Sequence, residues 1–121
     1  MAKSAKMNTS ILLEIKEQCG VTAEYDGFDP QLITDINSAF ATLHQLGYGP
    51  EEGFSIEGTS EEWDEIITSN RFNFIKNYII LKVHLMFDPP TSSIAVQQMN
   101  KEIDEYEWRI RSEVECYGEE D

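Results

Sequence analysis

The longest apolar segment of the chain, residues 71–87, admits two interpretations. From Ile79 to Phe87 alternate residues are apolar, which is typical of a strand. The length of the whole segment exceeds that of a usual strand, however, and Asn70 before it is a good helix N-cap. On a helical wheel its large apolar residues gather on one side, so we predict a helix from Asn70 to Phe87 at the centre of the fold. That apolar side comprises Phe72, Ile75, Tyr78, Ile79, Leu85 and Met86.

Two prolines separate this segment from a second long one. The ring of Pro89 disfavours the helical conformation at Asp88, and Pro90 prolongs the break, so the chain must turn here. Residues 91–93 then offer a helix N-cap. Beyond them apolar residues recur at alternating steps of three and four, interrupted only at Glu113, as in a helix that packs along a neighbour. This stripe comprises Val96, Met99, Ile103, Tyr106, Ile110 and Tyr117.

The first predicted helix lies near the N-terminus. Residues 8–10 are all good N-caps, the apolar residues of the segment are spaced for a helix, and Gly20 after Cys19 is a typical stop. Because its apolar face is narrow, this helix must dock on others to be stable. The face comprises Ile11, Leu12, Ile15 and Cys19.

A second helix is predicted from Asp29 to Leu46. Asp29 is a good N-cap, Pro30 suits the first helical position, and Gly47 is a typical stop. Its apolar residues form a continuous stripe at steps of three and four, as expected of a helix in the core. The stripe comprises Leu32, Ile33, Ile36, Ala39, Phe40, Leu43 and Leu46.

Residues 47–58 contain four glycines and a proline and lack the spacing of a phosphate-binding loop. We predict a long ordered loop that Tyr48, Phe54 and Ile56 pin to the core, with room for a short strand at 54–56. Long loops on a rigid scaffold often carry contacts, so this loop is either a partner-binding element or a cover for the core.

A short third helix should follow that loop. Thr59 as N-cap and Glu62 three residues later fit a capping box, and a helix to about Ile67 would bury Trp63, Ile66 and Ile67. The predicted fold is therefore mostly α: a small bundle of four to five helices with a glycine-rich loop between the second helix and a short third one. We divide the chain into one helical domain, 1–112, which begins with a mobile basic tail at 1–7, and an acidic tail, 113–121.

The charge restricts the function more than any motif does. The chain has 121 residues, 23 acidic and 9 basic, and a net charge of −14. Such a surface repels phosphates, which argues against nucleic-acid binding by counterion release. The acidic surface could keep the protein soluble. It could instead bind a basic partner surface, or line a passage through which DNA slides without sticking. Neither a secretory signal nor a membrane span is evident, and we expect the protein to be made in a cytoplasm.

Candidate chemistry is sparse. His44 and His84 fall on different predicted helices, and Cys19 and Cys116 lack metal-ligand spacing, so we interpret the cysteines as free thiols. The sequence contains no nucleophile motif, zinc spacing or calcium loop. We therefore predict no enzyme activity and no metal or cofactor.

Two residues depart from the amphipathic pattern. Lys82 projects from the apolar face of its helix, where a charge is costly unless paired, so it should meet an acidic residue, for example on the last helix, or reach water at a subunit border. Trp108 lies roughly 140° from the apolar stripe of its helix, on the side of Ile94, Lys101 and Asp104. It either anchors a subunit or partner contact or packs beneath the N-terminal helix or the long loop.

The order of these elements resembles the small head-to-tail connector, or adaptor, proteins of tailed bacteriophages. The resemblance covers about residues 10–112 and rests on packing signatures, among them Leu-Gly-Tyr-Gly-Pro at 46–50, Trp63, Phe-Asp-Pro-Pro at 87–90 and Glu-Trp-Arg at 107–109.

The resemblance implies a helical subunit of the virion neck. Such subunits form a ring, commonly dodecameric, beneath the portal protein and extend the DNA channel toward a downstream neck or tail-completion protein. DNA passes without specific binding, and no membrane is involved. We expect subunit or partner contacts on the second helix, the 47–58 loop and the Trp108 face, with a terminal segment reaching the portal. The candidate interface residues are Tyr48, Pro50, Phe54, Ile56, Lys82, Ile94, Trp108, Arg109 and Arg111.

A competing class is an acidic protein that mimics DNA and inhibits a DNA-binding enzyme. That class predicts carboxylates spaced like phosphates along one face, tight binding to a basic protein, and no ring. An enzyme is a distant third, since it would need Lys82 or His84 to line a cleft.

Overall fold

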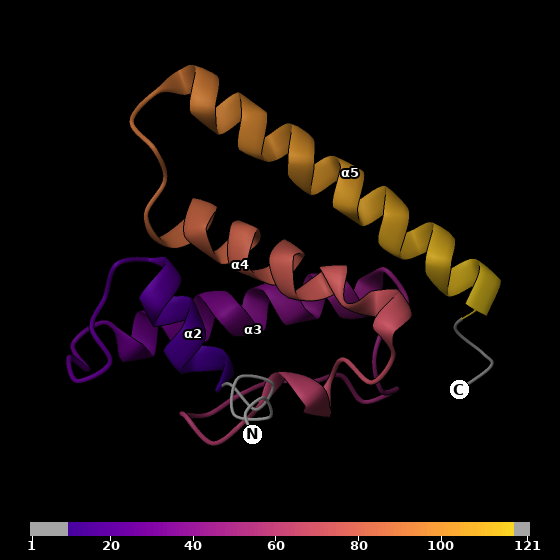
Figure 1. Cartoon of the computed structure of the whole chain (residues 1–121), viewed down its shortest axis with the longest axis horizontal. Coiled ribbons are helices and arrows are strands. Elements are labelled where there is room, and N and C mark those ends of the chain that lie inside the picture. Colours follow the sequence, from indigo (N-terminus) through magenta and orange to yellow (C-terminus); the bar gives the residue numbers. More distant parts are fainter. Residues whose placement is uncertain (1–9, 118–121) are drawn as a thin grey trace.

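The computed structural model describes residues 10–117, and this part of the chain is a bundle of four α-helices (Figure 1). Residues 10–117 contain no strand beyond an isolated antiparallel bridge between Ser10 and Glu62. The predicted mostly α fold is therefore confirmed, while the predicted tail at 1–7 lies outside the described residues. The elements are α2 (Ile11–Gln18), α3 (Asp29–Gln45), the 3-10 turns η1 (Trp63–Glu65) and η2 (Asn70–Phe72), α4 (Phe74–Phe87) and α5 (Ser93–Tyr117).

Helix α4 lies at the centre, as predicted, between α2 and α3 on one side and α5 on the other (Figure 1). The helical interpretation of residues 71–87 is confirmed, but two details differ. Asn70 does not cap α4: Ser69 caps η2 by accepting from the Arg71 amide, and α4 begins only at Phe74, because Phe72 turns inward against Tyr48. Met86, predicted on the buried side, is 38% exposed, since α4 ends one residue later. The buried side chains of α4 are Ile75, Tyr78, Ile79 and Val83.

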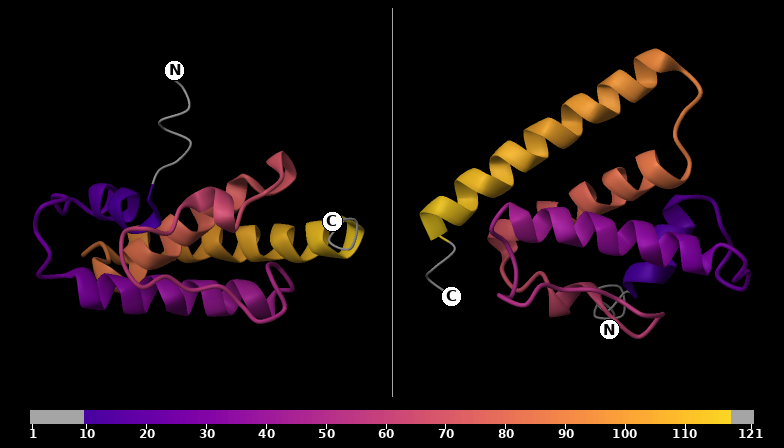
Figure 2. Two further views of the ribbon diagram at one scale, coloured as in Figure 1. Left: turned by 90° about the horizontal axis from the view of Figure 1, so that it is seen from below. Right: turned by 180° about the vertical axis from the view of Figure 1, so that it is seen from behind.

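Helix α5 packs along α4 through the middle of its predicted stripe. Ile103 and Ile110 are buried, and Tyr106 stacks on Phe74 of α4 with ring centroids 6.2 Å apart. Ser92 caps the helix by accepting from the Ala95 amide. The start of α5 stands away from the end of α4, and the two helices converge toward the C-terminal half of α5 (Figures 1 and 2).

The last turns of α5 also pack on the bundle. The helix passes position 112 without interruption and ends at Tyr117. Gly47, with φ +100°, ends α3, and a β-carbon there would lie 3.1 Å from the Val114 side chain. Residues 113–117 are therefore helical, while the division of the chain into a domain and an acidic tail stays a prediction.

The N-terminal helices begin close to the predicted positions. Ser10 caps α2 by accepting from the Leu13 amide, as its position predicted. In α3 the N-cap is Phe28 and not Asp29, and Pro30 is the second helical residue. The cap position is displaced because the Asp29 carboxylate pairs with Lys16 of α2.

Tyr48, Phe54 and Ile56 pin the loop 47–58, as predicted, and the structure shows that the loop is held against α3. The Asn37 side chain of α3 donates to the Ile56 carbonyl and accepts from the Ile56 amide, at 3.0 and 2.8 Å. Phe54 lies edge-on to Phe40, and Tyr48 donates to the Ile66 carbonyl. The expected strand at 54–56 is absent from the described chain because the Ile56 backbone bonds to a side chain instead.

The predicted short third helix is smaller than expected. Only the 3-10 turn η1 forms, and its capping box joins Glu62 and Glu65 in place of Thr59 and Glu62. Glu61 accepts from the amides of residues 57 and 58, which holds the preceding segment in a loop. Trp63 and Ile66 are buried as predicted, whereas Ile67 is only half-buried.

Candidate subunit interface

The outer face of α5 carries the two most exposed large apolar side chains of residues 10–117. Ile94 is 74% exposed and Trp108 is 68% exposed. Trp108 therefore does not pack beneath α2 or the 47–58 loop, which was one of its two predicted positions. It stands beside a shallow hollow lined by α5 residues, among them Lys101 and Asp104. Exposed aromatic residues amid charges are typical of contact anchors.

Four of the seven cations within residues 10–117 already have partners, and the other three lie on α5. Of the nine Lys and Arg residues, Lys3 and Lys6 lie outside the described part, and Arg71 has its own contacts. Within residues 10–117 ion pairs join Lys16 to Asp29, Lys76 to Glu14, and Lys82 to Glu107. The remaining three make no ion pair within those residues, and all are exposed on one helix beside Trp108. They are Lys101, Arg109 and Arg111.

Lys82 pairs with an acidic residue of α5, which was one of its two predicted roles. Its ammonium lies 3.5 Å from the Glu107 carboxylate, and the same carboxylate oxygen accepts from the buried Tyr78 hydroxyl at 2.8 Å. Burial, followed by the hydrogen bond and the charge of Glu107, raises the pKa of Tyr78 far above its usual range. The neutral hydroxyl is thus a permanent donor that holds Glu107 and fixes α5 against α4.

Replacing Tyr78 by phenylalanine should destabilise the subunit by about 1.5 kcal/mol, because Glu107 loses a charge-assisted hydrogen bond. Urea unfolding followed by circular dichroism measures the change. Tyr25→Phe is the matched control: the Tyr25 side chain is exposed, so the same substitution should stay within roughly 0.5 kcal/mol of wild type. Equal losses in both variants would contradict a specific role for the Tyr78 hydroxyl.

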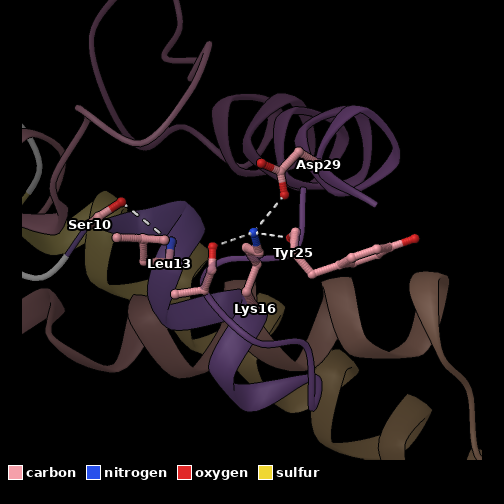
Figure 3. A network of polar contacts seen from close by, with 6 residues as sticks. Ser10, Leu13, Lys16, Tyr25 and Asp29 are labelled. Carbon is pink, nitrogen blue, oxygen red and sulfur yellow. Dashed lines mark hydrogen bonds and ion pairs between the residues drawn. The ribbon is translucent and has the colours of Figure 1, made fainter. Parts of the chain in front are cut away.

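A buried lysine, which sequence reasoning missed, organises the loop between α2 and α3. Lys16 is 1% exposed, and its ammonium donates to the carbonyls of Ala23 and Tyr25, at 3.1 and 2.6 Å, and pairs with Asp29 at 2.9 Å (Figure 3). These three acceptors match the three donors of an ammonium group. Its burial could have been predicted from its position four residues after Leu12, which places it on the edge of the apolar stripe.

The loop that Lys16 holds displays aromatic side chains. The Tyr25 ring points away from the ammonium (Figure 3), and it packs edge-on against Phe28 with centroids 5.3 Å apart. Phe28 in turn packs edge-on against Phe87 at the end of α4, also at 5.3 Å. Tyr25 is 52% exposed and Phe28 43% exposed. The fold thus forms a second exposed aromatic surface, which the hydrophobic periodicity of the sequence does not predict.

The other predicted interface residues divide between surface and core. Pro50 and Arg111 are exposed, and the Arg109 guanidinium lies 4.8 Å from the Phe74 ring centroid. Tyr48 and Phe54 are half-buried and face the core of their own subunit. Ile56 is 1% exposed, as expected of a side chain that pins the loop to the core: its backbone is fixed by Asn37 and its side chain is inside the bundle, while its part in an interface stays a prediction.

The two cysteines should differ in reactivity. Cys19 is half-buried and Cys116 is exposed. Burial raises the pKa of Cys19, and the nearby Asp88 and Asp35 carboxylates raise it further. Because the thiolate is the nucleophile, iodoacetamide at about pH 8 should label Cys116 roughly ten-fold faster than Cys19 in the unassembled subunit. Peptide mass spectrometry measures both rates, and similar native rates would contradict the burial of Cys19.

Within residues 10–117 no group of three or more histidine, cysteine, aspartate or glutamate side chains lies where it could hold a metal ion. None of the helices there is both long enough and apolar enough to span a membrane.

Comparison with known protein families identifies the chain. The model of the family described as phage connector protein matches residues 11–116, from the start of α2 to the last turn of α5. The chain belongs to the phage connector protein family. Searches of curated proteins and of solved structures gave no match. A phage connector is a structural protein, and membership implies a component of the virion neck.

Proposed function

We propose that copies of this connector form a closed ring, with twelve subunits as the expected number, beneath the portal of a phage capsid. The ring extends the DNA channel toward a downstream neck or tail-completion protein. Family membership supports a connector role.

The observation that carries the proposal is the exposed Trp108 on the outer face of α5. A tryptophan that is 68% exposed on a charged helix leaves a large apolar area in water, and covering it with another protein surface is favourable. Repetition of one such contact between unlike surfaces closes into a ring when the rotation per subunit divides a full turn. The exposed Trp108 therefore supports a cyclic assembly of connector subunits.

The net charge of −14 supports a passage for DNA. Carboxylates that face the bore repel the phosphate backbone, so DNA can move past them without being retained. This use of the charge requires no specific DNA site and agrees with a connector that binds DNA neither tightly nor by sequence.

The proposed subunit contacts follow the exposed parts of the predicted surfaces. They are α3, the exposed tip of the 47–58 loop at Pro50, and the face of α5 that bears Ile94, Trp108 and Arg111. Tyr48 and Phe54 support the subunit contact indirectly, because they hold the 47–58 loop in place. Lys82 supports it by holding α5 through its ion pair with Glu107. A terminal segment of the chain reaches the portal.

Negative-stain electron microscopy of the full-length chain mixed with its portal protein tests the proposal. We expect an additional collar of density on the tail-facing side of the portal ring, with rotational symmetry visible in class averages. Light scattering after size exclusion gives the mass of the complex and therefore the copy number. A portal ring that gains neither density nor mass would overturn the proposal.

A further inference from the structure

We infer that the ring contact joins two different ends of the subunit. The tryptophan face, Lys101, Trp108 and Arg111 on α5, meets the aromatic end, Tyr25, Phe28 and Met86, of a second copy of this chain. This inference rests on the proposed ring and names the two surfaces that close it.

The aromatic end gathers exposed apolar side chains from three segments, which the contacts of Phe28 with Tyr25 and with Phe87 bring together. Tyr25 comes from the α2–α3 loop, Phe28 from the start of α3 and Met86 from the last turn of α4, with exposed fractions of 52, 43 and 38%. Together with Ile94 and Trp108 these are the large apolar side chains exposed within residues 10–117. Aromatic residues and methionine are enriched at protein interfaces. Aromatic rings in particular bury much area while ordering few rotatable bonds.

The two surfaces complement each other in charge. Around the aromatic end the acidic residues Glu24, Asp26 and Asp88 are all exposed. On the tryptophan face Lys101 lies two turns before Trp108 and Arg111 lies one turn after it, and neither forms an ion pair within residues 10–117.

The acidic residues on α5 limit how the two faces can meet. Asp104 and Glu105 also lie on α5 near Trp108, so only contacts through the two cations favour an acidic partner. A guanidinium can in addition stack on Tyr25 or Phe28 of the neighbour.

The positions of the two surfaces suit a ring. The α2–α3 loop and the C-terminal half of α5 lie toward opposite ends of the long axis of the subunit in all three views (Figures 1 and 2). A contact between opposite ends is heterologous, and each added copy presents a new free surface until the ring closes. A contact of the tryptophan face with itself would instead stop at a dimer.

The buried Lys16 connects this contact to the core of the subunit. Its ammonium holds the carbonyl of Tyr25 itself and that of Ala23 two residues earlier. The aromatic end is therefore presented in a fixed conformation, which lowers the entropy lost when a neighbour binds.

Cross-linking within the assembled ring tests the pairing. We place a photoreactive benzoylphenylalanine at position 108 of the full-length chain, mix it with isotope-labelled wild-type chain on portal rings, and map the intermolecular products by mass spectrometry. Products within residues 20–30 or 84–90 of the labelled copy are expected. Rings that form but cross-link from position 108 to another region, to the same region of the neighbour, or to the portal alone would overturn the inference while leaving the ring proposal intact. If the wild-type chain by itself forms no ring on the portal, both are overturned.

A charge exchange provides the second test and does not depend on one bulky side chain. Lys101→Glu with Arg111→Glu, or Glu24→Lys with Asp26→Lys, should each reduce ring formation at least ten-fold, and a chain carrying all four changes should regain most of it. Asp64→Lys is the control, because Asp64 is exposed on η1 away from both surfaces and its reversal should leave assembly unchanged. Circular dichroism confirms that each variant is folded. Folded four-fold variants that remain unassembled while wild type forms rings would overturn the pairing.

Discussion

Replacing Lys16 by methionine should destabilise the subunit by about 3 kcal/mol, the largest loss we expect from a single polar side chain. Methionine fills a similar volume, so the loss comes from polar groups. The Asp29 carboxylate, 23% exposed, loses its counter-charge, and the carbonyls of Ala23 and Tyr25 lose their donor. Thermal unfolding should show a midpoint lowered by about 10 °C.

The exposed Lys101 supplies the matched control for this substitution. Lys101→Met changes an exposed position on α5 and should stay within roughly 0.5 kcal/mol of wild type. Adding Asp29→Asn to Lys16→Met should recover part of the loss, because the unpaired charge disappears. A Lys16→Met variant as stable as wild type would mean that the ammonium does not hold the loop.

Replacing Trp108 by serine should abolish ring formation while leaving the subunit folded. Trp108 is 68% exposed in the subunit, so its removal costs the core almost nothing. As the anchor of a contact, it should contribute about 2–4 kcal/mol at every interface. A closed ring repeats that loss at each subunit, so assembly should fail at concentrations where wild type is fully assembled. Light scattering of the mixture with portal rings measures the outcome.

Asp64→Ser is the control for Trp108→Ser, since Asp64 is exposed on η1, outside both proposed surfaces, and offers no large apolar surface. It should assemble as wild type does. Rings of normal mass from Trp108→Ser chains would show that the tryptophan lies outside the subunit contact, and the function of the outer face of α5 would have to be sought elsewhere.

The helices were predictable because burial imposes a period on the sequence. The stripes of α3 and α5 and the stop at Pro89 depend on local rules, and the structure places them within a few residues. The errors lie where a contact distant in sequence overrides a local preference. Asp29 pairs with Lys16 and is not the N-cap of α3. Phe72 points inward beside Tyr48, and α4 therefore begins only after it.

The candidate interface was only partly predictable. The outward direction of Trp108 follows from helical geometry alone, and the partner of Lys82 was foreseen as an acidic residue of the last helix. The aromatic end was not foreseen, because its three side chains come from three segments that meet only in the folded chain. Ile56 was predicted to pin the 47–58 loop to the core, and its burial and its backbone bonds to Asn37 confirm that prediction.

The tie between Lys16 and the α2–α3 loop has a consequence for the fidelity of virion construction. In the proposed ring, a copy in which α2 has not docked would lack the ammonium that shapes the loop and would not present Tyr25 correctly to a neighbour. Such defective copies should be rejected as the collar grows. Quality control would then be inherent in the subunit and would require no chaperone to inspect it.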